Sequence, residues 1–190
     1  MLDDPDALLM ERLQQGDDLA LNALMERWQT PLVHFIFRYI GQESEATDLA
    51  QETFVRVYQH RHQYRIGGKF STWLFTIASN LSRNFVRWQQ RHPNIPLEGI
   101  AGEENLPLKE RLPSSEATPA ERSIQMERVA IVKKEIHALP HDLRTAILLF
   151  EYENMSHAEI AAVLNCTPKA IETRLYRARE ILRKALAHLV

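Results

Sequence analysis

The sequence of 190 residues has one cysteine, six glycines and no long hydrophobic run. A single cysteine, Cys166, excludes an internal disulfide and a cysteine-based zinc site. The few glycines form neither a dinucleotide-binding fingerprint nor a P-loop. No stretch approaches the roughly 20 apolar residues that a membrane span needs, and the acidic N-terminus lacks the order of a signal peptide. We therefore expect a cytoplasmic protein without a cofactor or a metal.

Charge is distributed unevenly, although the formal net charge is only −2. Residues 1–52 carry three basic and eleven acidic side chains. Residues 53–92 carry seven basic and no acidic ones, and residues 167–190 carry six basic and two acidic ones. Two basic segments in an otherwise acidic chain predict two contacts with a polyanion, with acidic surfaces left for another partner.

Hydrophobic residues recur with helical periodicity almost throughout, and no run alternates as a strand would. We expect an all-α protein with helices over about 6–15, 18–40, 44–64, 71–90, 118–138, 142–152, 156–164 and 168–189. Pro31 predicts a kink or break in the second of these helices. The paired glycines at 67–68 predict a loop over 65–69.

A proline-rich stretch separates the helical segments into two groups. Five of the nine prolines fall between positions 93 and 119, where no helical pattern survives. Such a stretch is longer than most connections inside a domain. It predicts a flexible linker over 93–118 that joins two small helical domains, residues 1–92 and 119–190.

The C-terminal domain shows a helix-turn-helix pattern. Ser156 and Glu159 form a capping box for a short helix, and Thr167 with Pro168 opens a longer one after the turn at 165–167. The longer helix has an inward stripe of Ile171, Leu175, Ala178, Leu182 and Leu189. In such motifs the outward residues of the first turns enter the major groove, and here these are Lys169, Glu172, Thr173, Tyr176 and Arg177. A plain helical hairpin with a solvated charged face is the alternative.

Further residues of this motif have less specific roles. Arg174, Arg179, Arg183 and Lys184 are placed for phosphate contacts, which position a protein without reading sequence. Cys166 is interpreted as a small apolar residue packed in the turn rather than as a redox sensor.

The helix expected at 71–90 has two faces. Its apolar stripe consists of Phe70, Leu74, Ile77, Leu81, Phe85 and Trp88, and its other face carries Trp73, Asn80, Asn84, Arg87 and Arg91. An exposed aromatic ring beside cations is suited to single-stranded nucleic acid, and asparagine can bond to the edge of a base taken out of the stack. A core position for Trp73 is the alternative, against which the unopposed basic residues count.

The helix expected at 44–64 has a carboxylate-rich face. Asp48, Glu52 and Val55 lie at helical spacing, with Gln51 adjacent. Such a face can dock a basic helix of a protein partner, and a merely solvated face fits equally well.

Several segments resemble the extracytoplasmic-function (ECF) sigma factors of bacterial RNA polymerase. Residues 48–54 (DLAQETF), 70–74 (FSTWL) and 77–80 (IASN) resemble their region 2. Residues 139–140 (LP), 159–161 (EIA) and 174–179 (RLYRAR) resemble their region 4. The resemblance covers nearly the whole chain, with both domains in order and a linker between them.

The resemblance implies a role for each surface. The β′ clamp helices of core RNA polymerase would bind Asp48, Gln51, Glu52 and Val55, and the β flap is a further expected contact on the polymerase. The melted −10 strand of promoter DNA would be held by Lys69, Phe70, Trp73, Asn80, Arg83, Asn84, Arg87 and Arg91. The −35 duplex would be read by Lys169, Glu172, Thr173, Arg174, Tyr176 and Arg177.

The resemblance also implies regulation. An anti-sigma factor, often membrane-bound, would hold the protein inactive in the cytoplasm or at the inner membrane. No cofactor, metal or small-molecule substrate is expected. In one departure, Glu172 stands where many members carry a basic residue. Because a carboxylate can accept a hydrogen bond from the amino group of cytosine, we expect a −35 preference that depends on Glu172.

Two other classes of protein fit the sequence less well. A stand-alone helix-turn-helix regulator would need no strand-binding face and usually has a dimerisation surface, of which the sequence gives no clear sign. A helical metalloenzyme is suggested only by His60 and His62. Residues two apart on a helix face different sides, and no His-Glu-x-x-His motif is present.

Overall fold

The computed structural model describes residues 4–92 and 119–187, with side chains for all of these except 119–124. The linker expected at 93–118 and the stripe residue Leu189 lie outside the described residues.

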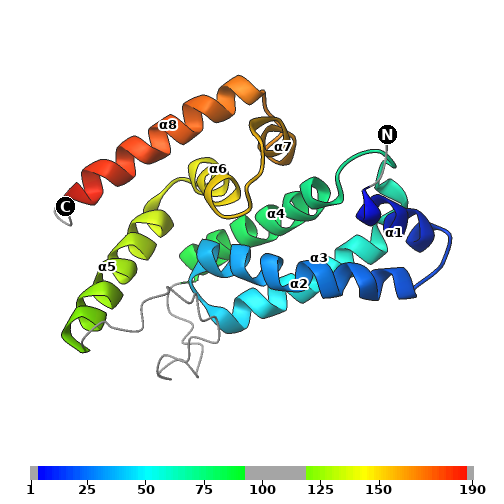
Figure 1. Ribbon diagram of the computed structural model, residues 1–190, viewed down its shortest axis with the longest axis horizontal. Helices are drawn as coiled ribbons and strands as arrows, with labels where there is room; N and C mark the ends of the chain where they lie inside the picture. The colour runs from blue at the N-terminus through cyan, green and yellow to red at the C-terminus, as the bar shows by residue number, and fades with distance from the viewer. Residues whose placement is uncertain (1–3, 93–118, 188–190) are drawn as a thin grey trace.

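Every regular element in this part of the chain is a helix, as predicted (Figure 1). The first half comprises α1 (Pro5–Gln14), α2 (Leu19–Ile40), α3 (Glu43–Gln59), a short 3-10 helix η1 (Arg61–Gln63) and α4 (Phe70–Arg91). The second half comprises α5 (Pro119–Ala138), α6 (His141–Glu151), α7 (His157–Val163) and α8 (Pro168–Ala185).

The caps of α7 and α8 are those that the sequence predicts. The Ser156 hydroxyl accepts a hydrogen bond from the Glu159 N–H at 3.3 Å, and Glu159 Oε2 accepts one from the Ser156 N–H at 2.7 Å. Thr167 Oγ1 accepts from the Ala170 N–H at 3.2 Å. These bonds satisfy backbone donors that have no partner inside a helix, so the start of each helix is fixed locally.

The helix expected at 44–64 is shorter than predicted, because α3 ends at Gln59. The side-chain amide of Gln14 donates to the carbonyls of Arg61 and Tyr64 at 2.7 and 2.9 Å. These bonds satisfy carbonyl groups that have left the helix. The Tyr64 side chain then turns into the core. A contact with α1 therefore overrides the helical periodicity after Gln59.

The helix α2 is continuous through Pro31, so of the predicted kink or break the break does not occur. Proline removes one backbone hydrogen bond from a helix. Buried residues stand on both sides of it, Leu24 before and Leu32 and Phe35 after. Their packing against the other helices of the first half offsets the lost bond.

An aromatic cluster forms the core of the first half and fixes the start of α4. Phe35, Phe70 and Phe75 are buried, and Trp28 makes edge contacts with Phe70 and Phe75, each at 6.1 Å between ring centroids. Edge-to-face pairs of this kind add roughly 0.5–1.5 kcal/mol each to the stabilisation from burial. Since Phe70 is the first residue of α4, the cluster anchors that helix.

In the second half, the inward stripe predicted for the last helix is confirmed over the described residues. Ile171, Leu175 and Ala178 are buried and Leu182 is partly buried. The helix is shorter than predicted, because α8 ends at Ala185.

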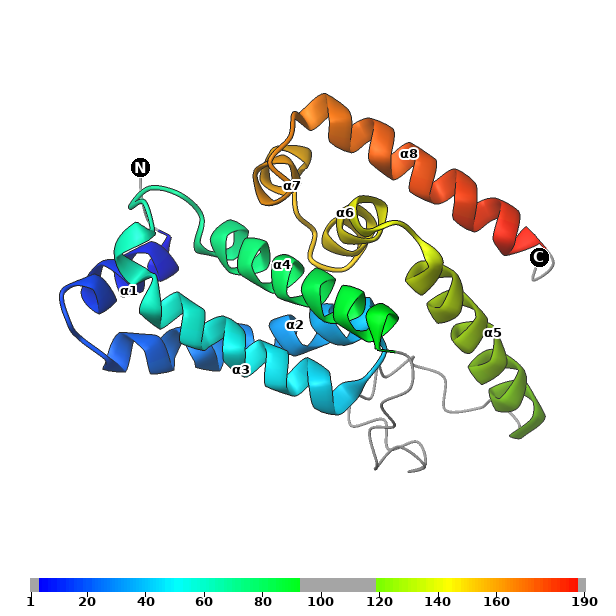
Figure 2. The same ribbon diagram turned by 180° about the vertical axis from the view of Figure 1, so that it is seen from behind.

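The two halves lie against each other, with α6 and α7 beside α2 and α4 (Figures 1 and 2). The buried Arg144 guanidinium donates to the Tyr39 carbonyl at the end of α2, at 3.0 Å, and to the Leu139 carbonyl at 3.1 Å. The Tyr39 hydroxyl and His141 Nδ1 share a hydrogen bond of 2.5 Å. The sequence predicts two domains but gives no indication of this contact.

Candidate nucleic-acid interface

The first turns of α8 carry a group of exposed polar side chains opposite its buried stripe. This group consists of Lys169, Glu172, Thr173, Tyr176 and Arg177. Tyr176 is the most exposed large apolar side chain of the helix, at 66%. All five sequence-predicted residues of this end are therefore accessible to a ligand, on one side of one helix.

Two of these residues form an ion pair with each other. The Lys169 ammonium donates a hydrogen bond to Glu172 Oε2, one turn along α8. This bond lowers the pKa of Glu172, so the carboxylate is charged at neutral pH. An acceptor-only group thus stands at the point where a major-groove helix reads base edges.

The turn between α7 and α8 is tight because Asn165 adopts a left-handed conformation, with φ of 48°. Asparagine tolerates this region better than most residues. The Cys166 N–H then donates to the Ala161 carbonyl at 2.9 Å. These two features set the direction in which α8 leaves α7.

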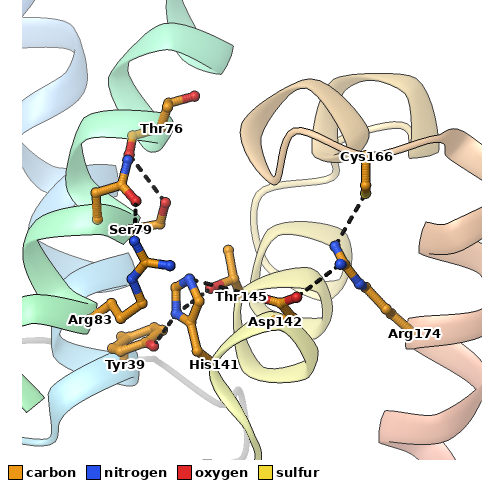
Figure 3. A network of polar contacts seen from close by, with 10 residues as sticks. Tyr39, Thr76, Ser79, Arg83, His141, Asp142, Thr145, Cys166 and Arg174 are labelled. Carbon is orange, nitrogen blue, oxygen red and sulfur yellow. Dashed lines mark hydrogen bonds and ion pairs between the residues drawn. The ribbon is translucent and has the colours of Figure 1, made fainter. Parts of the chain in front are cut away.

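Arg174 points into the second half rather than outward (Figure 3). Its guanidinium lies 2.8 Å from Asp142 Oδ2 on α6 and donates to Cys166 Sγ at 3.1 Å. Only 24% of its side chain is exposed. In this conformation Arg174 holds α8 to α6 and to the turn, and Cys166 is a partly buried acceptor in that turn.

The second half of α4 carries exposed amide and guanidinium groups. Asn80, Asn84, Arg87 and Arg91 are exposed, and Arg83 is half-buried with its guanidinium 3.3 Å from Asn80 Oδ1. A hollow of about 430 Å³ is lined by Asn84, Arg87, Gln90 and Arg91. Cations and amides on one helix can follow a phosphate backbone and bond to bases beside it.

Two aromatic residues at the start of α4 differ from each other. Phe70 is 0% exposed, so its predicted contact with DNA is wrong for this conformation, and its ring supports the site from inside. Trp73 is half-buried, with its ring centroid 5.3 Å from that of Tyr64. It lines a cavity of about 660 Å³ between α4 and α7. One part of the Trp73 side chain therefore packs in the core and another part faces the cavity.

Trp88 lies outside the core, although the apolar stripe of α4 includes it. Its side chain is 39% exposed and its ring stacks on His92 at 5.0 Å. The stripe holds at Phe70, Leu74 and Leu81 and weakens toward the end of the helix. The last turn of α4 therefore presents an additional aromatic surface beside Arg91.

The acidic face of α3 is on the surface. Asp48, Gln51 and Val55 are exposed, and Glu52 accepts from Arg56 Nε at 2.8 Å. Val55, at 47% exposure, adds an apolar contact to this face.

One ion pair between the halves was not predicted. Lys69, before α4, lies 2.6 Å from Glu159 Oε1 on α7. Partial burial of Glu159 opposes its ionisation, but the hydrogen bonds from Lys69 and Ser156 outweigh that effect and lower its pKa to about 2. The only sequence signal for this pair is the charge pattern, since Lys69 belongs to the basic segment and Glu159 to an acidic one.

Two further titratable groups lie between the halves. Burial lowers the pKa of His141 to about 4, and the nearby Arg83 guanidinium acts in the same direction. Burial raises the pKa of Glu153 to about 7, against the opposing charge of Arg38 at 3.9 Å. His141 is therefore neutral at physiological pH, while Glu153 changes its charge near that pH.

Within the described ranges, no three His, Cys, Asp or Glu side chains are arranged to hold a metal ion. Among the same residues, no helix is both long and apolar enough to cross a bilayer.

Comparisons with known proteins match both halves. The family model for Sigma-70 region 2 matches residues 24–92, and that for Sigma-70, region 4 matches residues 130–182. The ECF RNA polymerase sigma-E factor of Haemophilus influenzae is 35% identical over 187 residues, which cover 97% of each chain. The RNA polymerase sigma-H factor of Pseudomonas aeruginosa is 33% identical over 186 residues, which cover 97% of this chain and 95% of that one.

A solved structure is similar over the same length. CnrH, in complex with the cytosolic domain of CnrY, matches with a TM-score of 0.72 and 25% sequence identity. The match covers 97% of this chain and 99% of that one.

Proposed function

This chain belongs to the sigma-70 family of RNA polymerase sigma factors, in its ECF group, and we propose that it gives core polymerase its promoter specificity in two steps. The helix α8 reads the −35 element as closed duplex, and α4 captures the unpaired −10 strand. The protein performs no chemistry itself, because the polymerase supplies the catalytic site.

The observation that carries the first step is the exposure of one face at the start of α8. Tyr176 and Arg177 project from it while Leu175 and Ala178 anchor the opposite face. A helix held in this way can enter the major groove with its amino-terminal turns. Arg174, which is bound to Asp142, sets the orientation of α8 for this contact.

Within this step, Glu172 selects for cytosine. Its carboxylate is charged and can accept a hydrogen bond from the cytosine N4 amino group, but it repels phosphate and the acceptor edge of guanine. Binding requires Glu172 to exchange Lys169 for the base. The released ammonium is then available for a nearby phosphate.

The second step uses α4 and the residue before it. The ring of Trp73 offers a stacking surface for a flipped base, and stacking of this kind contributes roughly 1–3 kcal/mol per base. Asn80 and Asn84 supply donors and acceptors for the base edge. Lys69, Arg83, Arg87 and Arg91 hold the backbone.

Docking on the polymerase uses α3 and the second half. The exposed Asp48, Gln51 and Val55, with Glu52, fit the basic clamp helices of β′ by charge complementarity, and the second half binds the β flap. A regulator of the anti-sigma type fits the comparison with CnrH, which was solved with the cytosolic domain of a second protein. We propose that the chain works in the cytoplasm, where such a regulator, membrane-bound or free, controls it.

The test is transcription in vitro with purified core polymerase and a library of random promoter sequences. The expected result is initiation that requires both proteins and a selected consensus with two elements. Initiation without selection, or operator binding without any need for polymerase, would refute the proposal. Replacing Glu172 by Gln or Lys is expected to change the base preference at one −35 position and to leave the −10 consensus unchanged.

A further inference from the structure

The last turn of α4 and its cap carry two stacked rings on the surface. The Trp88 side chain is 39% exposed, and its ring lies 5.0 Å from that of His92 with 28° between the two planes. His92 Nδ1 also donates a hydrogen bond to the Trp88 carbonyl at 2.9 Å. Phe85 and Val86 in the preceding turn pack against the hydrophobic core, so α4 is anchored without Trp88. The terminal ring pair, Trp88 and His92, is therefore ordered and accessible.

Two arginines beside the terminal ring pair have no carboxylate partner among the described residues. Other arginines of the surface pair with a carboxylate, namely Arg12, Arg27, Arg56, Arg179 and Arg183. Arg87 and Arg91 are exposed and line the hollow of about 430 Å³ together with Asn84 and Gln90. Residues 53–92 contain no acidic side chain. The end of α4 is thus suited to bind a polyanion.

The last turn of α4 lies away from α7, which adjoins the start of that helix beside Trp73 (Figure 2). Positions 73 and 88 are about 22 Å apart along the helix axis and about 60° apart around it, at about 1.5 Å and 100° per residue. The two tryptophans therefore lie on adjoining faces. A strand with stacked bases covers this distance with about six or seven nucleotides, at about 3.4 Å each. A strand held at Trp73 can run along α4 to the terminal ring pair.

An aromatic ring can stack only on a base whose face is uncovered. In partly melted DNA, such bases are the unpaired ones and those of the last pair of the closed duplex. The chain leaves α4 at its last turn and continues to α8, which reads closed duplex in the proposed function. We therefore expect the duplex side of the melted region at the last turn of α4 and the unpaired side at Trp73.

We propose that Trp88, supported by His92, stacks on the last closed base pair upstream of the unpaired −10 strand, while Arg87 and Arg91 bind the adjacent phosphates. The proposal rests on the proposed function, in which α4 holds the unpaired strand, and adds a junction contact to it. This contact selects no particular base pair, because every base has a π-face. The ring takes the place of the next base pair, so it opposes closure of the duplex.

The test uses holoenzyme assembled from purified core polymerase and the full chain, with core polymerase alone as the background. Trp88→Phe keeps an aromatic ring, whereas Trp88→Leu keeps apolar volume without a ring. The control is Leu8→Ala, which truncates another exposed apolar side chain, on α1. Thermal melting of each free chain, followed by circular dichroism, shows whether the substitution has left the fold intact.

Three fluorescent DNA probes are prepared from one pool of strands of random sequence. The first is single-stranded, the second is a blunt duplex, and the third is a fork in which the non-template strand continues unpaired beyond the duplex. Fluorescence anisotropy gives the affinity of each holoenzyme for each probe. A second fork carries 2-aminopurine in the last base pair, because stacking against a ring quenches the fluorescence of this base.

The ring at position 88 is expected to matter for the fork alone. The unmodified chain, Leu8→Ala and Trp88→Phe should bind the fork at least about fivefold more tightly than Trp88→Leu does, which is the lower end of the contribution of an aromatic ring stacked on a base. All four should bind the single strand equally, and the duplex equally. Only Trp88→Leu should fail to quench 2-aminopurine.

The outcomes separate the junction contact from the proposed function. If Trp88→Leu binds the fork as tightly as the unmodified chain, the junction contact is refuted, while strand capture by α4 stands. If Trp88→Leu loses affinity equally for the fork and the single strand, Trp88 belongs to the strand site and the junction contact is again refuted. If no holoenzyme binds the single strand better than core polymerase alone, but binding of the fork still requires the ring, the junction contact stands and strand capture fails.

Discussion

Two glycines with the same backbone conformation allow a direct measurement of how much the contact between the halves contributes to the free energy of unfolding. Gly16 follows α1 with φ of 94°, and Gly41 follows α2 with φ of 82°. An added Cβ at Gly16 would meet nothing within 4 Å, whereas at Gly41 it would lie 2.5 Å from Cε1 of His137. Alanine at either position is strained by the left-handed backbone, but only Gly41→Ala also collides with the second half.

The difference between the two variants isolates this collision. The left-handed conformation costs a non-glycine residue roughly 1–2 kcal/mol, and this cost and the unfolded-state entropy are shared by both substitutions. In Gly41→Ala, His137 must move and lose its hydrogen bond to the Arg38 carbonyl, which is worth about 1 kcal/mol. We therefore expect Gly41→Ala to lower the free energy of unfolding by at least about 1 kcal/mol more than Gly16→Ala does.

Urea unfolding followed by circular dichroism measures the difference in the free energy of unfolding between the two variants. Small-angle X-ray scattering of the native proteins shows whether the two halves have moved apart. Gly41→Ala is expected to have a larger radius of gyration than Gly16→Ala, because the displaced residue belongs to the second half. Equal stabilities and equal radii would show that the end of α2 does not contact α5 in solution, and would refute the reasoning.

Three further results are expected. Trp73→Ala should impair promoter opening at least several-fold, because stacking contributes roughly 1–3 kcal/mol per base, while binding to core polymerase is unchanged. Permanganate footprinting measures promoter opening and a core-binding assay measures the affinity for polymerase. Normal opening would exclude the stacking role. Asp48→Arg should weaken binding to core polymerase in fluorescence titration, whereas Glu11→Arg, on α1, serves as the charge-matched control; an equal loss in both would indicate a general charge effect. Because burial raises the pKa of Glu153 from 4.5 to about 7, its carboxyl is protonated in both states below pH 4.5, and between pH 4.5 and 7 the unfolded state ionises first, so the native state loses stability as the pH rises through that window. The melting temperature of Glu153→Gln should therefore increasingly exceed that of the unmodified chain between pH 4.5 and 7 and by a constant amount above pH 7, and a constant difference across the whole range would contradict the buried carboxylate.

Local signals in the sequence predicted those elements that depend on neighbouring residues. The capping box at Ser156 and the cap at Thr167 satisfy donors three positions away, so the sequence around them is sufficient. The inward stripe of α8 was predicted for the same reason, because Ile171 and Leu175 occupy successive turns of one face.

Features that depend on distant residues were not predicted. The end of α3 at Gln59 depends on the side chain of Gln14. The hydrophobic periodicity of residues 44–64 does not reveal this contact. The place of Arg174 in the motif predicts a contact with DNA, yet in the structure Asp142 on another helix binds its side chain. The ion pair between the halves joins Lys69 and Glu159, which are 90 positions apart along the chain, and in the sequence only the opposite charges of their segments indicate it.

The position of Arg144 bears on how this protein can diverge from its relatives. Its guanidinium bonds at once to the Leu139 carbonyl of its own half and to the Tyr39 carbonyl of the other. A substitution of Arg144 would destabilise the second half and would also remove a hydrogen bond to the first half. We therefore expect this position to tolerate few substitutions. The Lys69–Glu159 pair at the rim of the cavity makes no contact of this kind with the fold of its own half. Exchanges at position 69 can therefore weaken or strengthen the contact between the halves in small steps, while the helices of both halves stay intact.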